Sequence, residues 1–410
     1  MISDNVIASI DIWSAKIRTV IGNFTEETGR DFNVLWVWIS TSNAIRKGNI
    51  LDMEEFKNNL DKSLEEAEKM AGEQISWVYL SLNSSSVEVV TSKWIIAVSW
   101  EEITEEDIDR VLDMAKNGVD LPNKEILKVI PEYFVVDLED GVRNPTGMSA
   151  RKLEVVANIF SINKNILWNI TKAVADVGIE IYDIFPNLLA SPEWVLTKRQ
   201  KELWVVCIDI WASTTWVTVY EEWVLKFSSV IPIGGDSVTN DIALWVRTSI
   251  DVAEKLKLDY SQLSLWDDKK IEKQISLNAI NRTEEGDVSN LYLSKIATAR
   301  YEEILMFVRD ELKMVWKDWM LPEGAMLVWG WAKQKGLLEL TKTVLRLPAF
   351  VGIPVEKESL TETSISDPVF SAVIWSMILA NKYSTDTKWF SINISWFFNS
   401  IVKVFKKILP

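Results

Sequence analysis

One short unit occurs twice in this sequence and constrains the fold more than any other feature. Residues 7–13 read IASIDIW and residues 205–211 read VVCIDIW, and small or hydroxyl residues and a second β-rich run follow each. Short apolar runs bounded by a polar turn are typical of buried strands. A four-residue identity alone is compatible with chance, but the shared context favours a duplication. We therefore predict two similar α/β halves.

Periodic patterns elsewhere predict further elements of an α/β protein. Apolar residues spaced by three or four positions indicate helices. Helices are expected over 52–71, 104–116, 237–246, 252–258, 294–316 and 368–382. Strands are expected over 78–82, 87–90 and 326–328. Residues 266–289 are polar and variable, so we expect a surface excursion there.

Composition excludes several classes of function. The chain has 410 residues and a formal net charge of -15, with acidic and basic residues mixed, so no basic stripe predicts nucleic acid as a partner. It contains no histidine, which excludes Ser-His-Asp catalysis and imidazole metal sites. The single cysteine, Cys207, lies in an apolar run and is expected to be buried. No secretory leader or uninterrupted apolar stretch of ~18 residues is seen, so we expect the bulk of the protein to be cytoplasmic.

The turns after Asp11 and Asp209 combine an acid with hydroxyl residues, a pattern suited to nucleotide phosphates. Main-chain N–H groups can contact phosphate only where the backbone approaches closely, and glycine permits this because it has no Cβ. The sequence instead places Trp13 and Trp211 in these turns. A third turn, residues 328–332 (VWGWA), has the same conflict. An indole in either turn would fill the volume that a phosphate needs.

These motifs resemble those of the FtsA family of bacterial cell-division actin homologues, over essentially the whole chain. Residues 11–16 resemble the first phosphate motif of that family, residues 209–215 the second and residues 328–332 the adenosine motif, and each fits better if Trp is replaced by Gly. Less generic stretches also match, namely 46–48 (RKG), 130–131 (IP) with Asp137, 144–148 (NPTGM), 231–243 (IPIGGDSVTNDIA), and Ala253 and Glu254 with Lys257.

The excess of tryptophan matches a deficit of glycine. The chain has 21 Trp and 15 Gly, whereas glycine averages about 7% of residues. We hypothesise that most of these tryptophans are glycines in the cell, whose genome would read the codon UGA as glycine. The alternative is a naturally tryptophan-rich protein. Positions outside the turns that support the hypothesis are Trp36, Trp38, Trp100, Trp223 and Trp375.

The resemblance implies an actin-like ATPase fold, with two α/β halves and ATP and Mg²⁺ held between them. Asp11 and Asp209 would hold Mg²⁺ through water, because this ion loses its hydration reluctantly. The other implied nucleotide contacts are Trp13, Ser14, Lys16, Trp211, Ser213, Thr214, Thr215, Gly234, Gly235, Glu254, Lys257, Trp329, Gly330 and Trp331. Either acid could instead be a strand-end turn residue or a helix cap, and Glu254 with Lys257 could form a solvated helix face.

Catalysis is less well specified than binding. Asp209 is the candidate for positioning a hydrolytic water, and no catalytic residue is identified in the crossover near Asn187. We therefore expect slow or absent ATP hydrolysis, with ATP acting as a ligand that sets conformation and polymer state.

The resemblance also implies a division into segments. Residues 1–83, with 364–382, would form the first half, and 84–162 an inserted subdomain that makes polymer contacts. Residues 163–363 would form the second half, whose outer part, 236–297, would receive the C-terminal tail of FtsZ. A linker over 383–394 and a membrane-targeting helix over 395–410 complete the division.

The final segment, residues 395–410 (SWFFNSIVKVFKKILP), predicts an amphipathic helix. It is too short to cross a bilayer, but an apolar stripe beside lysines is typical of a helix that lies in the membrane interface. The predicted membrane contacts are Phe397, Phe398, Ile401, Lys403, Phe405, Lys406, Lys407 and Ile408. The lysines favour anionic lipid despite the acidic body, since the attraction is local. The alternative is a terminal helix docked on its own domain.

Function follows from the resemblance. Members of the family tether FtsZ filaments to the cytoplasmic face of the cell membrane at the division site, self-associate into filaments and recruit other division proteins. Two alternatives remain open: an ATP-binding scaffold of type IV pilus assembly, and a catalytic member of the superfamily such as a sugar kinase. The pilus assembly protein lacks an amphipathic tail, and a sugar kinase would have no use for one.

Overall fold

A computed structural model gives the structure of the chain. It describes residues 6–12, 16–24, 32–41, 44–46, 48–72, 74–99, 101–264, 272–315, 320–328, 334–352 and 376. Residues 329–332 of the predicted adenosine turn, the predicted helix over 368–382 apart from residue 376, the linker and the membrane helix therefore lie outside the described residues. The same is true of Trp13, Ser14, Trp100 and Trp375. The chain divides into two compact units, and the boundary falls between Ala190 and Ser191.

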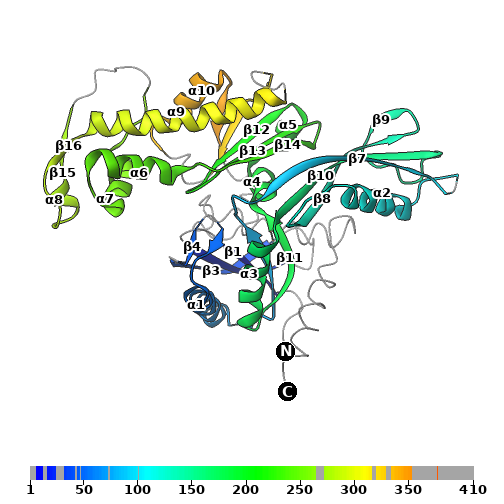
Figure 1. The fold of residues 1–410 in the computed structure, drawn as a ribbon, viewed down its shortest axis with the longest axis horizontal. Helices are drawn as coiled ribbons and strands as arrows, with labels where there is room; N and C mark the ends of the chain where they lie inside the picture. Colours follow the sequence, from blue (N-terminus) through cyan, green and yellow to red (C-terminus); the bar gives the residue numbers. More distant parts are fainter. Residues whose placement is uncertain are drawn as a thin grey trace. The chain divides into compact units, whose positions relative to one another are not determined.

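The first unit contains a five-stranded mixed sheet in the order β11-β6-β1-β2-β3. Strands β1, β3 and β11 of this sheet are labelled in Figure 1. Its strands are β1 (Val6–Ile12), β2 (Lys16–Phe24), β3 (Phe32–Thr41), β6 (Trp77–Leu82) and β11 (Glu180–Pro186). The β1–β2 and β2–β3 pairs are antiparallel, whereas β6 runs parallel to β1 and β11 parallel to β6. Trp36 and Trp38 lie in β3.

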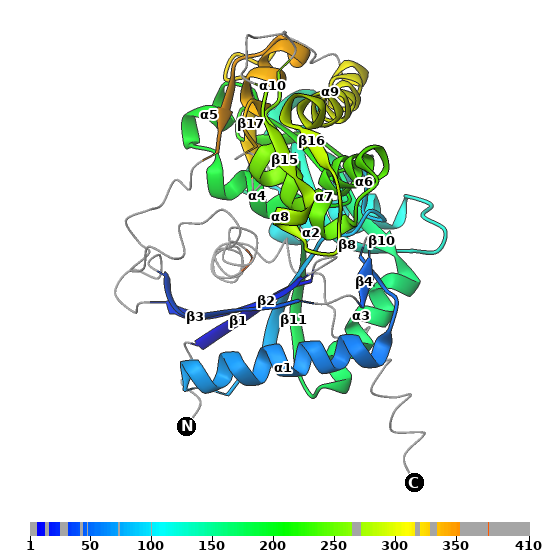
Figure 2. The same cartoon turned by 90° about the vertical axis from the view of Figure 1, so that its left-hand side faces the viewer.

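Helix α1 (Met53–Ala71) lies along one face of this sheet (Figure 2). Its buried residues include Phe56, Leu60 and Leu64, which fall on one stripe. Asp52 begins the helix by accepting a hydrogen bond from the Glu55 backbone N–H at 3.0 Å. The predicted helix over 52–71 is thus confirmed. The short hairpin β4 (Ile45–Arg46) and β5 (Asn49–Ile50) precedes it, and α3 (Lys164–Asp176) packs beside it.

An antiparallel sheet with its own core interrupts the first unit between β6 and β11. Its order is β7-β10-β8-β9, formed by β7 (Glu88–Ala97), β8 (Lys124–Val136), β9 (Glu139–Val142) and β10 (Lys152–Asn163). Helix α2 (Glu105–Asn117) packs on this sheet through Ile108, Val111 and Ala115.

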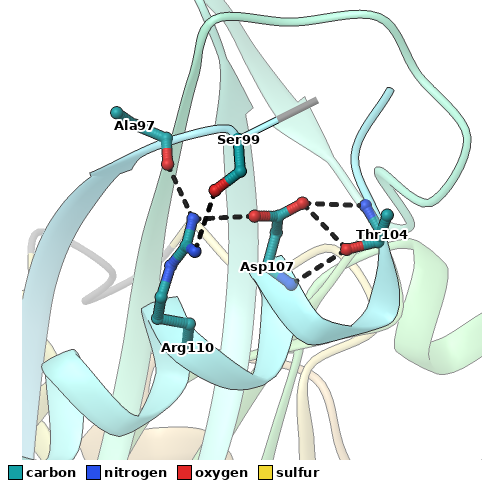
Figure 3. A network of polar contacts seen from close by, with 5 residues as sticks. All are labelled: Ala97, Ser99, Thr104, Asp107 and Arg110. Atoms are coloured by element: carbon teal, nitrogen blue, oxygen red, sulfur yellow. Dashed lines mark hydrogen bonds and ion pairs between the residues drawn. The ribbon is translucent and has the colours of Figure 1, made fainter. Parts of the chain in front are cut away.

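Thr104 begins α2, as predicted, through a reciprocal capping box (Figure 3). The Asp107 carboxylate accepts from the Thr104 backbone N–H at 3.1 Å, and the Thr104 hydroxyl accepts from the Asp107 N–H at 3.3 Å. Arg110 then donates to Asp107 and to the Ala97 carbonyl, both at 2.7 Å. The cap therefore joins the start of the helix to the end of β7.

The second unit repeats the sheet of the first. Its order is β14-β13-β12-β17-β18, with strands β12 (Val205–Ile210), β13 (Thr215–Glu221), β14 (Val224–Ile231), β17 (Ala325–Val328) and β18 (Ala349–Val351). The β12–β13 and β13–β14 pairs are antiparallel, whereas the β12–β17 and β17–β18 pairs are parallel. The strands around β1 in the first unit have the same pattern. The predicted duplication is confirmed.

Helices accompany the second sheet, and those from α6 onward contribute residues to its core. They are α4 (Asn187–Val195, which begins in the first unit), α5 (Lys198–Glu202), α6 (Gly235–Val246), α7 (Ile250–Lys255), η1 (Leu256–Tyr260, a π-helical turn), α8 (Leu277–Ile280), α9 (Asn290–Met314) and α10 (Leu337–Leu345). The long helix α9 packs against α6 and α10 (Figure 1).

Two details of the second unit differ from the sequence predictions. The helix expected over 252–258 is split into α7 and η1. The excursion over 266–289, for which no element was predicted, contains the hairpin β15 (Gln274–Ser276) and β16 (Asp287–Ser289). Ile275 and Val288 of this hairpin join the core of the unit, and each is the single apolar residue of a three-residue strand, which is too short to show an alternating pattern. Within the described residues, no helix is long and apolar enough to cross a membrane.

Candidate phosphate-binding turns

Asp11 lies near the end of β1 and is fully buried. Arg18 stands opposite it across the β1–β2 pair, and its Nη1 donates to Asp11 Oδ2 at 3.0 Å. Asn187, which begins α4, donates from Nδ2 to Asp11 Oδ1 at 3.1 Å. Ser81, the parallel partner of Asp11 on β6, donates its hydroxyl to Asn187 Oδ1. Both carboxylate oxygens of Asp11 are therefore engaged by the protein itself.

This arrangement determines what Asp11 can do. Burial raises the pKa of the Asp11 carboxyl, and Arg18 and Asn187 oppose that shift. A hard cation such as Mg²⁺ prefers carboxylate oxygens that are not already paired with a guanidinium. Asp11 therefore does not fit a direct metal ligand in this geometry. Contact through water is the form of the prediction that remains open.

Asp209 occupies the equivalent place at the end of β12 but has different partners. It is nearly fully buried, and the Ser191 hydroxyl donates to its Oδ2 at 2.5 Å. Its cross-strand partner is Trp216 and its parallel partner is Val328. Cys207, two residues earlier on β12, is buried as predicted, and burial raises the pKa of its thiol.

The turn after Asp209 is packed with indoles. Trp211 and Trp216 are both 1% exposed. The Trp216 indole Nε1–H donates to Thr214 Oγ1 at 2.8 Å, and the Thr215 hydroxyl donates to the Ile233 carbonyl at 2.8 Å. Both predicted threonines thus have hydrogen-bond partners in the protein.

Main-chain contacts join this turn to the start of α6. The Gly235 N–H donates to the Trp211 carbonyl and the Asp236 N–H to the Ala212 carbonyl, each at 2.7 Å. A Cβ added at Gly234 would lie 2.2 Å from the Trp211 carbonyl oxygen. Glycine is needed at position 234 for space. The structure therefore brings together the two predicted segments around Asp209 and Gly234.

Lys257, on η1, contacts the start of α6 beside the turn after Asp209. It is fully buried, and its Nζ donates to the Gly235 carbonyl at 3.1 Å and to Thr239 Oγ1. Glu254 Oε2 lies 2.5 Å from Lys257 Nζ and accepts from the Thr239 hydroxyl at 2.5 Å. Burial lowers the pKa of Lys257. The alternative of a solvated face is wrong for Lys257, although Glu254 is 37% exposed.

The fold and these turns match a known family. Residues 206–374 match the family described as "Cell division protein FtsA", and residues 84–161 match "SHS2 domain inserted in FTSA". Cell division protein FtsA of Bacillus subtilis (strain 168) is 31% identical over 358 residues, which cover 86% of this chain and 80% of the relative. The chain belongs to the FtsA family. FtsA of Pseudomonas aeruginosa is 28% identical over 384 residues, covering 94% of this chain and 91% of the relative.

Solved structures show the same actin-like fold. The PilM-PilN type IV pilus biogenesis complex gives a TM-score of 0.64 at 14% identity, covering 92% of this chain and 98% of that one. MreB5 of Spiroplasma citri bound to ADP gives 0.52 at 12% identity, covering 93% and 97%. The predicted FtsA resemblance and actin-like fold are confirmed, and the chain is an actin-like cell-division protein of the FtsA family.

Sequence reasoning missed several residues at these turns. Arg18 was detectable as a cation within an otherwise apolar strand. Asn187 was noticed only for its place in the crossover, and Ser191 and Thr239 gave no signal because their partners are distant in sequence. Among the predicted contacts, Lys16 begins β2 and its side chain lies outside the described residues, as do residues 329–331. No cluster of three or more metal-ligating side chains occurs in the described part of the chain.

Proposed function

We propose that this FtsA-family protein binds ATP at the turns that follow Asp11 and Asp209 and tethers FtsZ filaments to the cytoplasmic face of the cell membrane. Membership of the family carries the proposal. The two acids at equivalent places near the ends of β1 and β12 are consistent with it. Solved MreB5 structures of the same fold hold ADP or AMPPNP.

The cluster around Gly234 would contact the nucleotide. The positive end of the α6 dipole suits an anion near its first residue, and the buried Lys257 adds positive charge beside it. In the family pattern, Glu254 and Lys257 would approach the ribose and adenine. The fixed contacts of Lys257 to Gly235 and Thr239 would couple this part of the nucleotide to the phosphate turn.

Mg²⁺ would be held through water, with Asp209 as the better placed acid. When bound, the ion would neutralise phosphate charge. Asp209 could also orient a water, but its Oδ2 already accepts from Ser191. We therefore expect slow or absent hydrolysis and a mainly conformational role for ATP.

The tethering role assigns tasks to three segments. Residues 395–410 would lie in the membrane interface and favour anionic lipid. The outer part of the second unit, 236–297, would receive the FtsZ C-terminal tail, and the SHS2 domain at 84–161 would contribute to self-association and to recruitment of other division proteins.

Vesicle flotation with FtsZ tests the tether. Full-length protein and a chain ending at Tyr383 are each mixed with FtsZ, ATP and vesicles containing anionic lipid. Full-length protein should carry FtsZ to the floating fraction, whereas the shortened chain should leave it behind. Vesicles of neutral lipid serve as the control, because the lysines should lose their attraction. Equal flotation of FtsZ by both chains would contradict the proposal.

A further inference from the structure

Two tryptophans of the second unit have backbone conformations that favour glycine. Trp204 has φ 66° and Trp223 has φ 71°, both in the left-handed region. A residue with a Cβ is disfavoured there, because Cβ crowds the following carbonyl oxygen, and a bulky residue is an outlier. Glycine adopts this conformation without that penalty. Both positions lie outside the phosphate turns and so form an independent observation.

Trp204 stands at the point where a helix ends. Leu203 caps α5 by donating its N–H to the Arg199 carbonyl at 3.1 Å, and Trp204 follows in the left-handed conformation. This is the position at which glycine commonly terminates helices. The Trp204 carbonyl also accepts from the Glu323 N–H at 3.2 Å, so the local backbone path is tied to the rest of the unit.

Trp223 lies in the two-residue turn between β13 and β14. Glu221 pairs with Val224, and the residues between them, Glu222 and Trp223, have φ 46° and 71°. Positive φ at both central residues defines a type I′ turn, in which glycine is preferred at the second position. The Trp223 N–H donates to the Lys201 carbonyl at 2.9 Å, which fixes the turn.

At Trp211 the difficulty is the volume of the side chain, whereas at Trp204 and Trp223 it is the backbone conformation. Its side chain is buried in a turn where phosphate binding requires exposed main-chain N–H groups. Its carbonyl accepts from Gly235 N–H, so its backbone lies at the candidate anion site. Trp36 shows a related mismatch: its indole Nε1 is buried with no hydrogen-bond partner among the described residues. A buried unpaired donor is costly.

We infer that Trp204, Trp211 and Trp223 occupy positions at which the cell inserts glycine, and that the functional protein has a glycine turn after Asp209. Reassignment of UGA from a stop codon to glycine would account for the joint excess of 21 Trp and deficit of glycine, since reading UGA as Trp would convert each such glycine. The inference does not depend on the proposed tethering function, which can fail separately.

Codons and native peptide mass test the inference directly. Trypsin releases residues 202–226 as one peptide, because no lysine or arginine lies between Lys201 and Lys226, and this peptide contains Trp204, Trp211, Trp216 and Trp223. In protein purified from its own cells, the peptide should have glycine at positions 204, 211 and 223, with UGA codons. UGG codons, or tryptophan at these positions in the native peptide, would overturn the inference.

Recombinant variants test the backbone argument separately. Trp204→Gly and Trp223→Gly are compared with Trp204→Ala and Trp223→Ala, which also remove the indole but keep Cβ. Glycine should give the larger folding equilibrium constant by roughly tenfold at each site. Trp168, within helix α3, is the matched control, where alanine should be the more stable replacement. Alanine equal to or better than glycine at both turn positions would also overturn it.

Discussion

The two acid-bearing strand pairs are built alike, yet their acids have opposite environments. Asp11 and Asp209 occupy the same place in sheets of the same order, each facing a large buried residue across an antiparallel pair. For Asp11 that residue is the cation Arg18, and for Asp209 it is the indole of Trp216. The repeated sequence thus places an acid at the same position in both sheets. The cross-strand partner, which is not repeated, determines whether a buried positive charge lies beside that acid.

Each unit also has a buried cation near its turn, Arg18 in the first and Lys257 in the second, and the two have different partners. In the first unit Arg18 pairs with the acid itself. In the second unit Lys257 pairs with Glu254 and with the main chain at the start of α6. At the second turn the Ser191 hydroxyl donates to the acid, so this described donor is neutral, whereas the donor Arg18 at the first turn is a cation.

Replacement of Arg18 should have the largest effect, because it leaves a buried carboxylate without its cation. Arg18→Met should lower the free energy of unfolding by about 3–5 kcal/mol, measured by urea denaturation. Adding Asp11→Asn should recover much of the loss, since the remaining group is neutral. Ser191→Ala, which removes a neutral partner from Asp209, is the matched comparison and should cost only about 2 kcal/mol. Equal costs would show that the two acids do not differ as described.

Gly234→Ala tests how closely the second turn is packed against α6. The new Cβ would lie 2.2 Å from the Trp211 carbonyl oxygen, so the turn and α6 must separate. We expect a loss of about 2–3 kcal/mol in unfolding free energy. Gly352→Ala is the control and should cost less, because the three atoms nearest its Cβ would belong to the Val195 side chain, at 3.0–3.2 Å. No difference between the two variants would mean that the close approach at Gly234 is not required.

Lys257→Met tests the smallest of these expected effects, a loss of nucleotide affinity. In protein with glycine at positions 13, 211, 329 and 331, it should weaken Mg-ATP binding about tenfold, as for loss of one charge-assisted contact. Lys255→Met, on the exposed side of α7, should leave the affinity unchanged. Isothermal titration calorimetry measures both, and equal affinities would remove Lys257 from the proposed site.

The predictions from the sequence were strongest where a local pattern repeats or alternates. The helix at 52–71 and the capped start at Thr104 were predictable, because each depends on residues within one or two turns of each other. The hairpin at 274–289 was not, because its burial depends on helices far away in the chain. The change from α-helix to a π-helical turn after residue 255 was not predictable either, because the apolar spacing does not distinguish the two.

At the candidate turns, what the sequence determined can also be separated from what the tertiary structure decided. The sequence by itself determined the duplicated strands, the places of Asp11 and Asp209, and the mismatch of tryptophan with a phosphate turn, because strand periodicity and side-chain volume are local properties. Only the tertiary structure decided that Asp11 is tied to Arg18 and Asn187, that Lys257 is buried against Gly235, and that Trp204 and Trp223 have left-handed backbones. Those outcomes depend on contacts between segments distant in sequence and on turn geometry imposed by the packed sheet.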